Sequence, residues 1–262
     1  MANKSGAASE ENGDNQSSAG GNFPLFFQKP APLDMLRHGK AGLLPAQDYS
    51  FTRDTNSIVI NGIEFVEAAK YYPIVFTQTK IPLPCVILGL ERENYFVGPK
   101  GRWKEDTYIP AYVRKYPFVF MDVTERKQLV LCIDEAAPQF KKAGGKNTLP
   151  LYEGDKPSAL TRNALEFCTA YHNHHVITRG FSEDLRDADL LVPSQSNAKL
   201  ANGRTIDLGN FQVIDEQKLN SLPDEKILEF HKKGWLPLIY FSLMSGSHWK
   251  KLADMAGERE SK

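Results

Sequence analysis

The hydrophobic positions in the first half of the chain form short runs that turn-forming residues separate. Runs of this length, rich in apolar and β-branched residues, predict strands at 57–60, 74–76, 85–90, 95–97, 118–121 and 128–133. Asn61, with Glu64 three residues later, matches a capping box, so we expect a short helix after the first of these strands. Thr107 can cap another short helix, which tolerates Pro110 in its early turn and ends at Pro117.

The second half of the chain carries the longer apolar periods that are typical of helices. We expect helices from Ser158 to about Thr178, from Ser182 onward, from Asp215 onward, after Pro223 up to Gly234, and from Trp235 to Met255. Asn202-Gly203, between residues 199–201 and 205–208, is a strong hairpin signal. Together these elements predict an α+β fold, with a mostly antiparallel sheet of short strands, short crossing helices and a more helical C-terminal half.

The domain organisation follows from where apolar residues are missing. Residues 1–22 contain no aromatic and no branched aliphatic side chain, so we expect a disordered N-terminal tail. Residues 23–262 are interpreted as a single domain. The glycine-rich segment 138–157 is loop-like, and it fits an internal boundary as well as a long loop within one domain.

Composition narrows the class of protein. Lys and Arg number 32 and so do Asp and Glu, which excludes a generally basic surface for nucleic acid. The most apolar stretch, residues 235–244, is shorter than the ~20 residues that a membrane helix needs. An apolar signal segment is missing near the start, and the three cysteines are an odd number, so we expect a cytoplasmic protein without disulfides.

A block of aromatic and basic residues is the strongest candidate for a binding site. Aromatic rings beside a guanidinium can hold a peptide carboxylate, a sugar or an aromatic ligand. The same rings can instead pack a helix on the sheet, with each hydroxyl bonded locally. A loop histidine can serve the same site. The candidate ligand-binding residues are therefore Trp103, Tyr108, Tyr112, Arg114, Tyr116 and His38.

A second group combines one cysteine with two histidines. On a helix, Cys168, His172 and His175 share one face, with the spacing of metal ligands or of a thiolate–imidazole pair. Leu165 and Val176 indicate that this face is also the core face, which favours a buried thiol and two amphipathic rings. We therefore assign no metal site and keep these three residues as weak candidates only.

Paired carboxylates form the third group. Asp134-Glu135 and Asp215-Glu216 can perform acid–base chemistry when burial separates their pKa values. Each pair also follows an apolar strand, where a turn or a helix cap explains it, and we expect Asp215 to be an N-cap. The sequence carries neither a Gly-x-Ser-x-Gly nor a His-Glu-x-x-His motif, so it names no reaction.

One block of the sequence is especially specific, Tyr-Ile-Pro-Ala-Tyr-Val-Arg-Lys-Tyr-Pro-Phe at 108–118. It occurs in order with further blocks at His38, 64–65 with 72–76, Gly89, Asn94, Gly101, Trp103, 133–135, 213–219 and 234–245. Over about residues 32–252, these blocks resemble the bacterial SapC family. The family usually reads Arg-Arg where this chain has Arg114-Lys115, so the resemblance implies a charge at 115 without the planar fork.

The resemblance implies a role rather than a reaction. The family is named after gene clusters for a bacterial surface-layer protein, and it brings no established reaction, cofactor or catalytic residue. We therefore expect a cytoplasmic binding or accessory protein that recognises a peptide or protein linked to cell-surface assembly or uptake. The alternative is an enzyme acting on a peptide or amino-acid-like ligand, with metal dependence left open. A purely structural subunit is a third hypothesis, and the cofactor and assembly into a homo-oligomer are left open.

Overall fold

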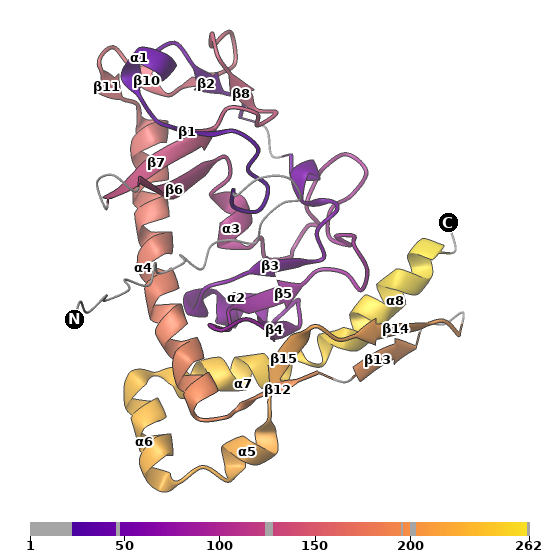
Figure 1. The fold of residues 1–262 in the computed structure, drawn as a ribbon. Coiled ribbons are helices and arrows are strands. Elements are labelled where there is room, and N and C mark those ends of the chain that lie inside the picture. Colours follow the sequence, from indigo (N-terminus) through magenta and orange to yellow (C-terminus); the bar gives the residue numbers. More distant parts are fainter. Residues whose placement is uncertain (1–22, 46–47, 124–127, 195, 200–202, 261–262) are drawn as a thin grey trace, which may run out of the picture.

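The computed structural model describes residues 23–45, 48–123, 128–194, 196–199 and 203–260. The tail expected at 1–22 and the turn residue Asn202 lie outside these ranges. The fold is α+β, with antiparallel sheets of short strands and a helical C-terminal region, as the sequence predicts (Figure 1).

The larger sheet has five strands in the order β12-β15-β4-β5-β3, and all neighbours are antiparallel. Short apolar runs form β3, β4 and β5, whose side chains are mostly buried on both faces, whereas β12 and β15 are partly exposed. The main hydrophobic cluster surrounds this sheet. Its strands are β3 Ser57–Val59, β4 Ile74–Thr77, β5 Pro84–Ile87, β12 Leu191–Pro193 and β15 Phe211–Ile214.

The other strands form smaller sheets rather than extensions of the first. A three-stranded sheet has the order β1-β7-β6, and another has the order β8-β2-β9. Two hairpins, β10-β11 and β13-β14, complete the set. The bounds are β1 Pro30–Pro32, β2 Gly42–Leu43, β6 Phe118–Val123, β7 Gln128–Asp134, β8 Phe140–Lys141, β9 Leu149–Pro150, β10 Tyr152–Glu153, β11 Lys156–Pro157, β13 Ser196–Lys199 and β14 Thr205–Leu208.

The helices are mostly short, with one exception. Helix α4 has 29 residues and runs along one side of the molecule, past β6 at one end and η2 at the other (Figure 1). The described part of the chain contains no helix that is long and apolar enough to cross a membrane. The helices are α1 Met35–His38, η1 Ser50–Thr52, η2 Gly62–Glu64, α2 Phe65–Ala68, α3 Ala111–Arg114, α4 Ala159–Asp187, α5 Glu216–Asn220, α6 Asp224–Lys233, α7 Trp235–Ser245 and α8 His248–Glu260.

Two capping interactions predicted from the sequence are confirmed, because in each a side chain accepts a backbone N–H group at the start of its helix. The Glu64 carboxylate accepts the Asn61 backbone N–H at 2.8 Å, as a capping box requires. Asp215 caps α5 by accepting two backbone N–H groups, and α6 ends at Gly234 in the left-handed conformation. Asp215 is thus the N-cap that the sequence predicts.

Several predicted elements are wrong in extent. The two helices expected from Ser158 and from Ser182 are one helix, because Ser182 is buried inside α4. The single helix expected from Trp235 to Met255 is broken between α7 and α8. Segment 95–97 contributes only the isolated bridge from Val97 to Trp103. Residues 138–157 hold the short strands β8 to β11 instead of an open loop, and their role as a domain boundary stays a prediction.

The buried carboxylate of Asp134 ties the N-terminal segment to the three-stranded sheet. Its two oxygens accept the backbone N–H groups of Gln28, Lys29 and Ala136 at 2.8–3.1 Å, and the Tyr116 hydroxyl at 3.1 Å. Four donors satisfy the four acceptor positions of an ionised carboxylate. Asp134 is therefore a structural residue at the end of β7, and its two oxygens are already occupied by these four donors.

We predict that Asp134→Asn lowers the free energy of unfolding by about 1–3 kcal/mol, because the new amide faces N–H and O–H donors. Urea denaturation measures this loss. The matched control is Asp187→Asn at the exposed end of α4, where the change should stay within about 0.5 kcal/mol. Equal effects of the two substitutions would show that the network around Asp134 does not hold the segment.

Candidate functional site

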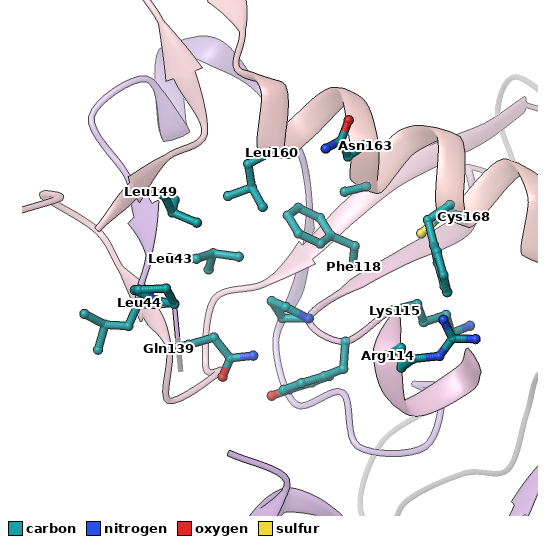
Figure 2. Close-up of a pocket in the computed structure, with 15 residues that line it drawn as sticks. Leu43, Leu44, Arg114, Lys115, Phe118, Gln139, Leu149, Leu160, Asn163 and Cys168 are labelled. Carbon is teal, nitrogen blue, oxygen red and sulfur yellow. The ribbon is translucent and has the colours of Figure 1, made fainter. Parts of the chain in front are cut away.

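A pocket of about 460 Å³ lies where α3, the start of β6 and α4 meet. Figure 2 shows its two unlike ends, with leucines at one end and the nitrogens of Arg114 and Lys115 at the other. We call it the cationic pocket. It is lined by Leu43, Leu44, Pro45, Arg114, Lys115, Tyr116, Pro117, Phe118, Gln139, Leu149, Leu160, Asn163, Ala164, Phe167 and Cys168.

Helix α3 sets the positions of the two cations. Pro110 is its N-cap, and the first backbone N–H of the helix, from Ala111, donates to the Glu64 carboxylate at 2.7 Å. The helix ends at Arg114 with Lys115 as its C-cap, and Pro117, which lacks a backbone N–H, prevents any continuation. This one-turn helix leaves Arg114 exposed at the pocket and turns Lys115 into the protein.

Arg114 is held in place by uncharged groups. Its Nε donates to the Ile109 carbonyl at 3.0 Å, and one Nη donates to the Tyr108 hydroxyl at 3.2 Å. Its guanidinium carbon lies 5.2 Å from the Phe167 ring centre and 5.6 Å from the Tyr108 ring centre. No ion pair joins Arg114 to a carboxylate of the described residues. The guanidinium thus presents its charge to the pocket mouth.

A buried carboxylate stands behind this guanidinium. Glu64 accepts the Tyr108 hydroxyl at 2.9 Å in addition to the two backbone N–H groups described above. Burial raises the pKa of Glu64, while these three hydrogen bonds and the charge of Arg114 lower it. The Tyr108 hydroxyl therefore connects the buried Glu64 carboxylate to the more exposed Arg114 guanidinium.

Lys115 is packed between two aromatic rings. Its Nζ lies 4.3 Å from the ring centres of both Tyr112, on α3, and Tyr171, on α4. A cation between two rings in a desolvated setting gains about 2 kcal/mol or more. This contact fixes α3 against α4 and places positive charge beside the wall of the cationic pocket.

A second pocket, of about 230 Å³, shares a wall with the first. Arg114 and Phe167 line both, so this stacked pair separates them. We call it the Glu64 pocket. Its lining is Asn61, Ile63, Glu64, Tyr108, Ala111, Arg114, Phe167, Ala170, Tyr171 and His174.

Comparison with known proteins gives one match that covers this whole region. A family model described as SapC matches residues 33–252, which include every residue of both pockets. The chain belongs to the SapC family. No curated protein and no solved structure matches the chain.

In this SapC-family chain, the candidate binding residues separate into two sets. Tyr108, Arg114 and Tyr116 reach one or both pockets, and the Tyr116 hydroxyl also bonds to Asp134. Trp103 and Tyr112 are buried: the indole donates to Tyr72 at 3.2 Å, and the Tyr112 hydroxyl donates to the Leu25 carbonyl at 3.2 Å.

The helix on which these residues were expected is shorter than predicted. Pro110 caps it in place of Thr107, whose hydroxyl instead donates to the Lys104 carbonyl. Tyr108 therefore precedes α3 and does not share a helical face with Tyr112. Trp103 lines a different surface pocket of about 550 Å³, beside Tyr49.

His38 lies away from both pockets, at the corner between α1 and β7. Its side chain is 1% exposed, and its Nε2 lies 3.3 Å from the Glu135 carboxylate. Arg37 donates to both oxygens of the same carboxylate, and with Lys29 it holds the pKa of Glu135 at about 2. These contacts support a structural role for His38 and Glu135.

The metal-like spacing on α4 does not assemble a ligand set. The described residues contain no group of three His, Cys, Asp or Glu side chains that could hold a metal ion. Cys168 and His175 are buried, as expected for a core face. However, the expectation that Leu165 and Val176 mark that face is wrong, because they are 46% and 57% exposed. The core face of α4 instead mixes polar residues with large apolar ones, and its buried members are Thr161, Cys168, Tyr171, His175, Thr178, Phe181, Ser182 and Leu185.

Cys168 nevertheless lies beside residues of the aromatic block, because it lines the cationic pocket together with Arg114, Lys115 and Tyr116. Burial raises the pKa of its thiol to about 11, although the charge of Lys115 acts in the opposite direction. At neutral pH it is a thiol rather than a thiolate, which leaves it a poor nucleophile.

Sequence reasoning missed Phe167, which lines both pockets, and also Glu64 and the leucines, which each line one of them. Phe167 carries no motif and becomes important because Arg114 stacks on it. Glu64 gives a clear local signal as a cap, but nothing near it in sequence points to Tyr108. The leucines of the apolar end come from β2, β9 and α4, which only the fold brings together.

We predict that iodoacetamide leaves the native protein unlabelled at pH 7.5 over minutes, while the urea-unfolded chain takes up three labels. The reason is that burial raises the pKa values of Cys85, Cys132 and Cys168 to between about 11 and about 12. Intact mass spectrometry counts the labels. Rapid single labelling that Cys168→Ser abolishes would identify an activated thiolate and contradict this account.

Proposed function

We propose that this SapC-family protein is a binding protein for a peptide segment that carries a negative charge next to an apolar side chain. The observation behind this proposal is the charge distribution in the cationic pocket. Among its described lining residues, only Arg114 and Lys115 are charged, and both are positive. The Arg114 guanidinium forms no ion pair with a carboxylate of the described residues, and such a guanidinium is a natural recognition group for a peptide carboxylate.

The opposite end of the pocket supports the apolar half of the ligand. Leu43, Leu149 and Leu160 gather there, and Leu149 is 47% exposed at the rim. Covering such a leucine removes apolar surface from water, which favours binding by roughly 25 cal/mol per Å². A volume of about 460 Å³ also lies within the usual range for ligand pockets and exceeds the size of one side chain.

Polar groups of the pocket suit a peptide backbone. The amides of two lining residues add polar groups: Asn163, which is exposed, lies between the leucine and cationic ends, and Gln139 lies beside Leu44 at the leucine end. Side-chain amides both donate and accept, as a bound main chain requires. A peptide is therefore favoured over a simple aliphatic acid, which offers no groups for these amides.

The finer parts of the proposal come from the sequence. The missing signal segment and the odd number of cysteines predict a cytoplasmic location, and the resemblance implies a partner linked to cell-surface assembly or uptake. An enzyme acting on a peptide or amino-acid-like ligand stays the alternative prediction, and the raised thiol pKa gives no support to a cysteine mechanism.

The test uses fluorescein-labelled octapeptide pools in anisotropy titrations with wild-type protein. We expect selection of peptides that place Asp, Glu or a free C-terminal carboxylate beside Leu or Phe. Arg114→Gln should weaken the selected peptides at least about tenfold, since it removes a charge-assisted bond worth more than about 1.4 kcal/mol. The wild-type affinity should also fall as salt is raised.

The matched control is Arg92→Gln, which removes the same charge from an exposed arginine outside both pockets. It should leave the affinity unchanged. If the wild type binds no peptide of the pools, or if both substitutions weaken binding equally, the proposal is wrong.

A further inference from the structure

The two pockets lie along one face of the same helix. Leu160, Ala164 and Phe167 face the cationic pocket, and Phe167, Ala170 and His174 face the Glu64 pocket. Steps of three and four residues place these side chains on a single face of α4. The face of α4 from Leu160 to His174, which we call the floor of the two pockets, is about 21 Å long at ~1.5 Å per residue. This length matches about six residues of extended peptide at ~3.3 Å each.

Arg114 contacts this floor at Phe167, near its middle rather than at one end. It lines both pockets, and the apolar side chains Leu149 and Ile63 are exposed at the rims on the two sides, the latter at 61%. A carboxylate bound at Arg114 therefore has apolar surface to cover on either side of it. A ligand that ended at its carboxylate would cover only one of these surfaces.

The groups in the Glu64 pocket favour an uncharged occupant. The Glu64 carboxylate already accepts three hydrogen bonds, one of them from the Tyr108 hydroxyl, which in turn accepts from Arg114. The rest of the lining includes Ile63, Ala170 and the Phe167 ring, which suit an aromatic or aliphatic side chain.

Building on the proposed function, we infer that the partner is an internal peptide segment that runs along α4. Its acidic side chain pairs with Arg114, a leucine-like residue enters the cationic pocket, and an apolar residue on the other side enters the Glu64 pocket. The recognised feature is thus an acidic residue flanked by two apolar ones, and a free C-terminus is not required.

Substitutions on α4 test this because each adds a leucine at one defined place. Ala170→Leu narrows the Glu64 pocket, Ala164→Leu narrows the cationic pocket, and Thr169→Leu adds the same side chain on the opposite face of the helix. Leucine is a good helix former, so all three variants should fold, and circular dichroism checks this.

Two fluorescein-labelled probes are titrated by anisotropy. The long probe is an amidated octapeptide with one glutamate between phenylalanine and leucine, made in both orders to allow either chain direction. The short probe is a tetrapeptide that ends in leucine with a free carboxylate. For the order that binds better, we expect Ala170→Leu to weaken the long probe roughly tenfold and to leave the short probe unchanged.

Ala164→Leu should weaken both probes, and Thr169→Leu should weaken neither. If the wild type binds the long probe but Ala170→Leu does not weaken it, the extension into the Glu64 pocket is wrong while the proposed function stands. If the short probe binds as tightly as the long one, the extension is also wrong. If neither probe binds the wild type, the extension and the proposed function fail together.

Discussion

The contact on which the site depends is the ammonium of Lys115 between two tyrosine rings. Tyr112 belongs to α3 and Tyr171 to α4, so this one cation joins a four-residue helix to the longest helix of the fold. A helix of one turn has little stability of its own, and packing must supply it. Because Lys115 points into the protein, the side chain of its neighbour Arg114 lies on the outside of α3. There it contacts the Phe167 ring of α4.

The charges of the site form a graded arrangement from core to surface. Glu64 is buried and bonded to backbone groups, Tyr108 bridges it to Arg114, and Arg114 is exposed beside the cationic pocket. Buried charge is costly unless it is paired or hydrogen-bonded, so this series keeps each group satisfied while the outermost cation stays open to a ligand. The three tyrosine hydroxyls of the aromatic block each have a structural acceptor, which is Glu64 for Tyr108, the Leu25 carbonyl for Tyr112 and Asp134 for Tyr116.

Elements that depend on interactions between neighbouring residues can be predicted from the sequence. Strands β4 to β7 and the caps at Asn61 and Asp215 follow from runs and spacings of neighbouring residues. The continuity of α4 through Ser182 does not, because burial in the completed core overrides the local cap signal. The site divides in the same way: Arg114 stands out in the sequence, whereas Phe167 gains its role only because α4 and α3 meet.

The most direct test of the account is hydrogen–deuterium exchange with and without the amidated octapeptide in which glutamate lies between phenylalanine and leucine. If a peptide lies along α4 over Arg114, slower exchange should appear in residues 111–118 and 160–174. Exchange in α6 and α8, which line neither pocket, should be unchanged. Slower exchange confined to other parts of the chain, with residues 160–174 unaffected, would contradict the central claim that the face of α4 beside Arg114 is a peptide-binding surface.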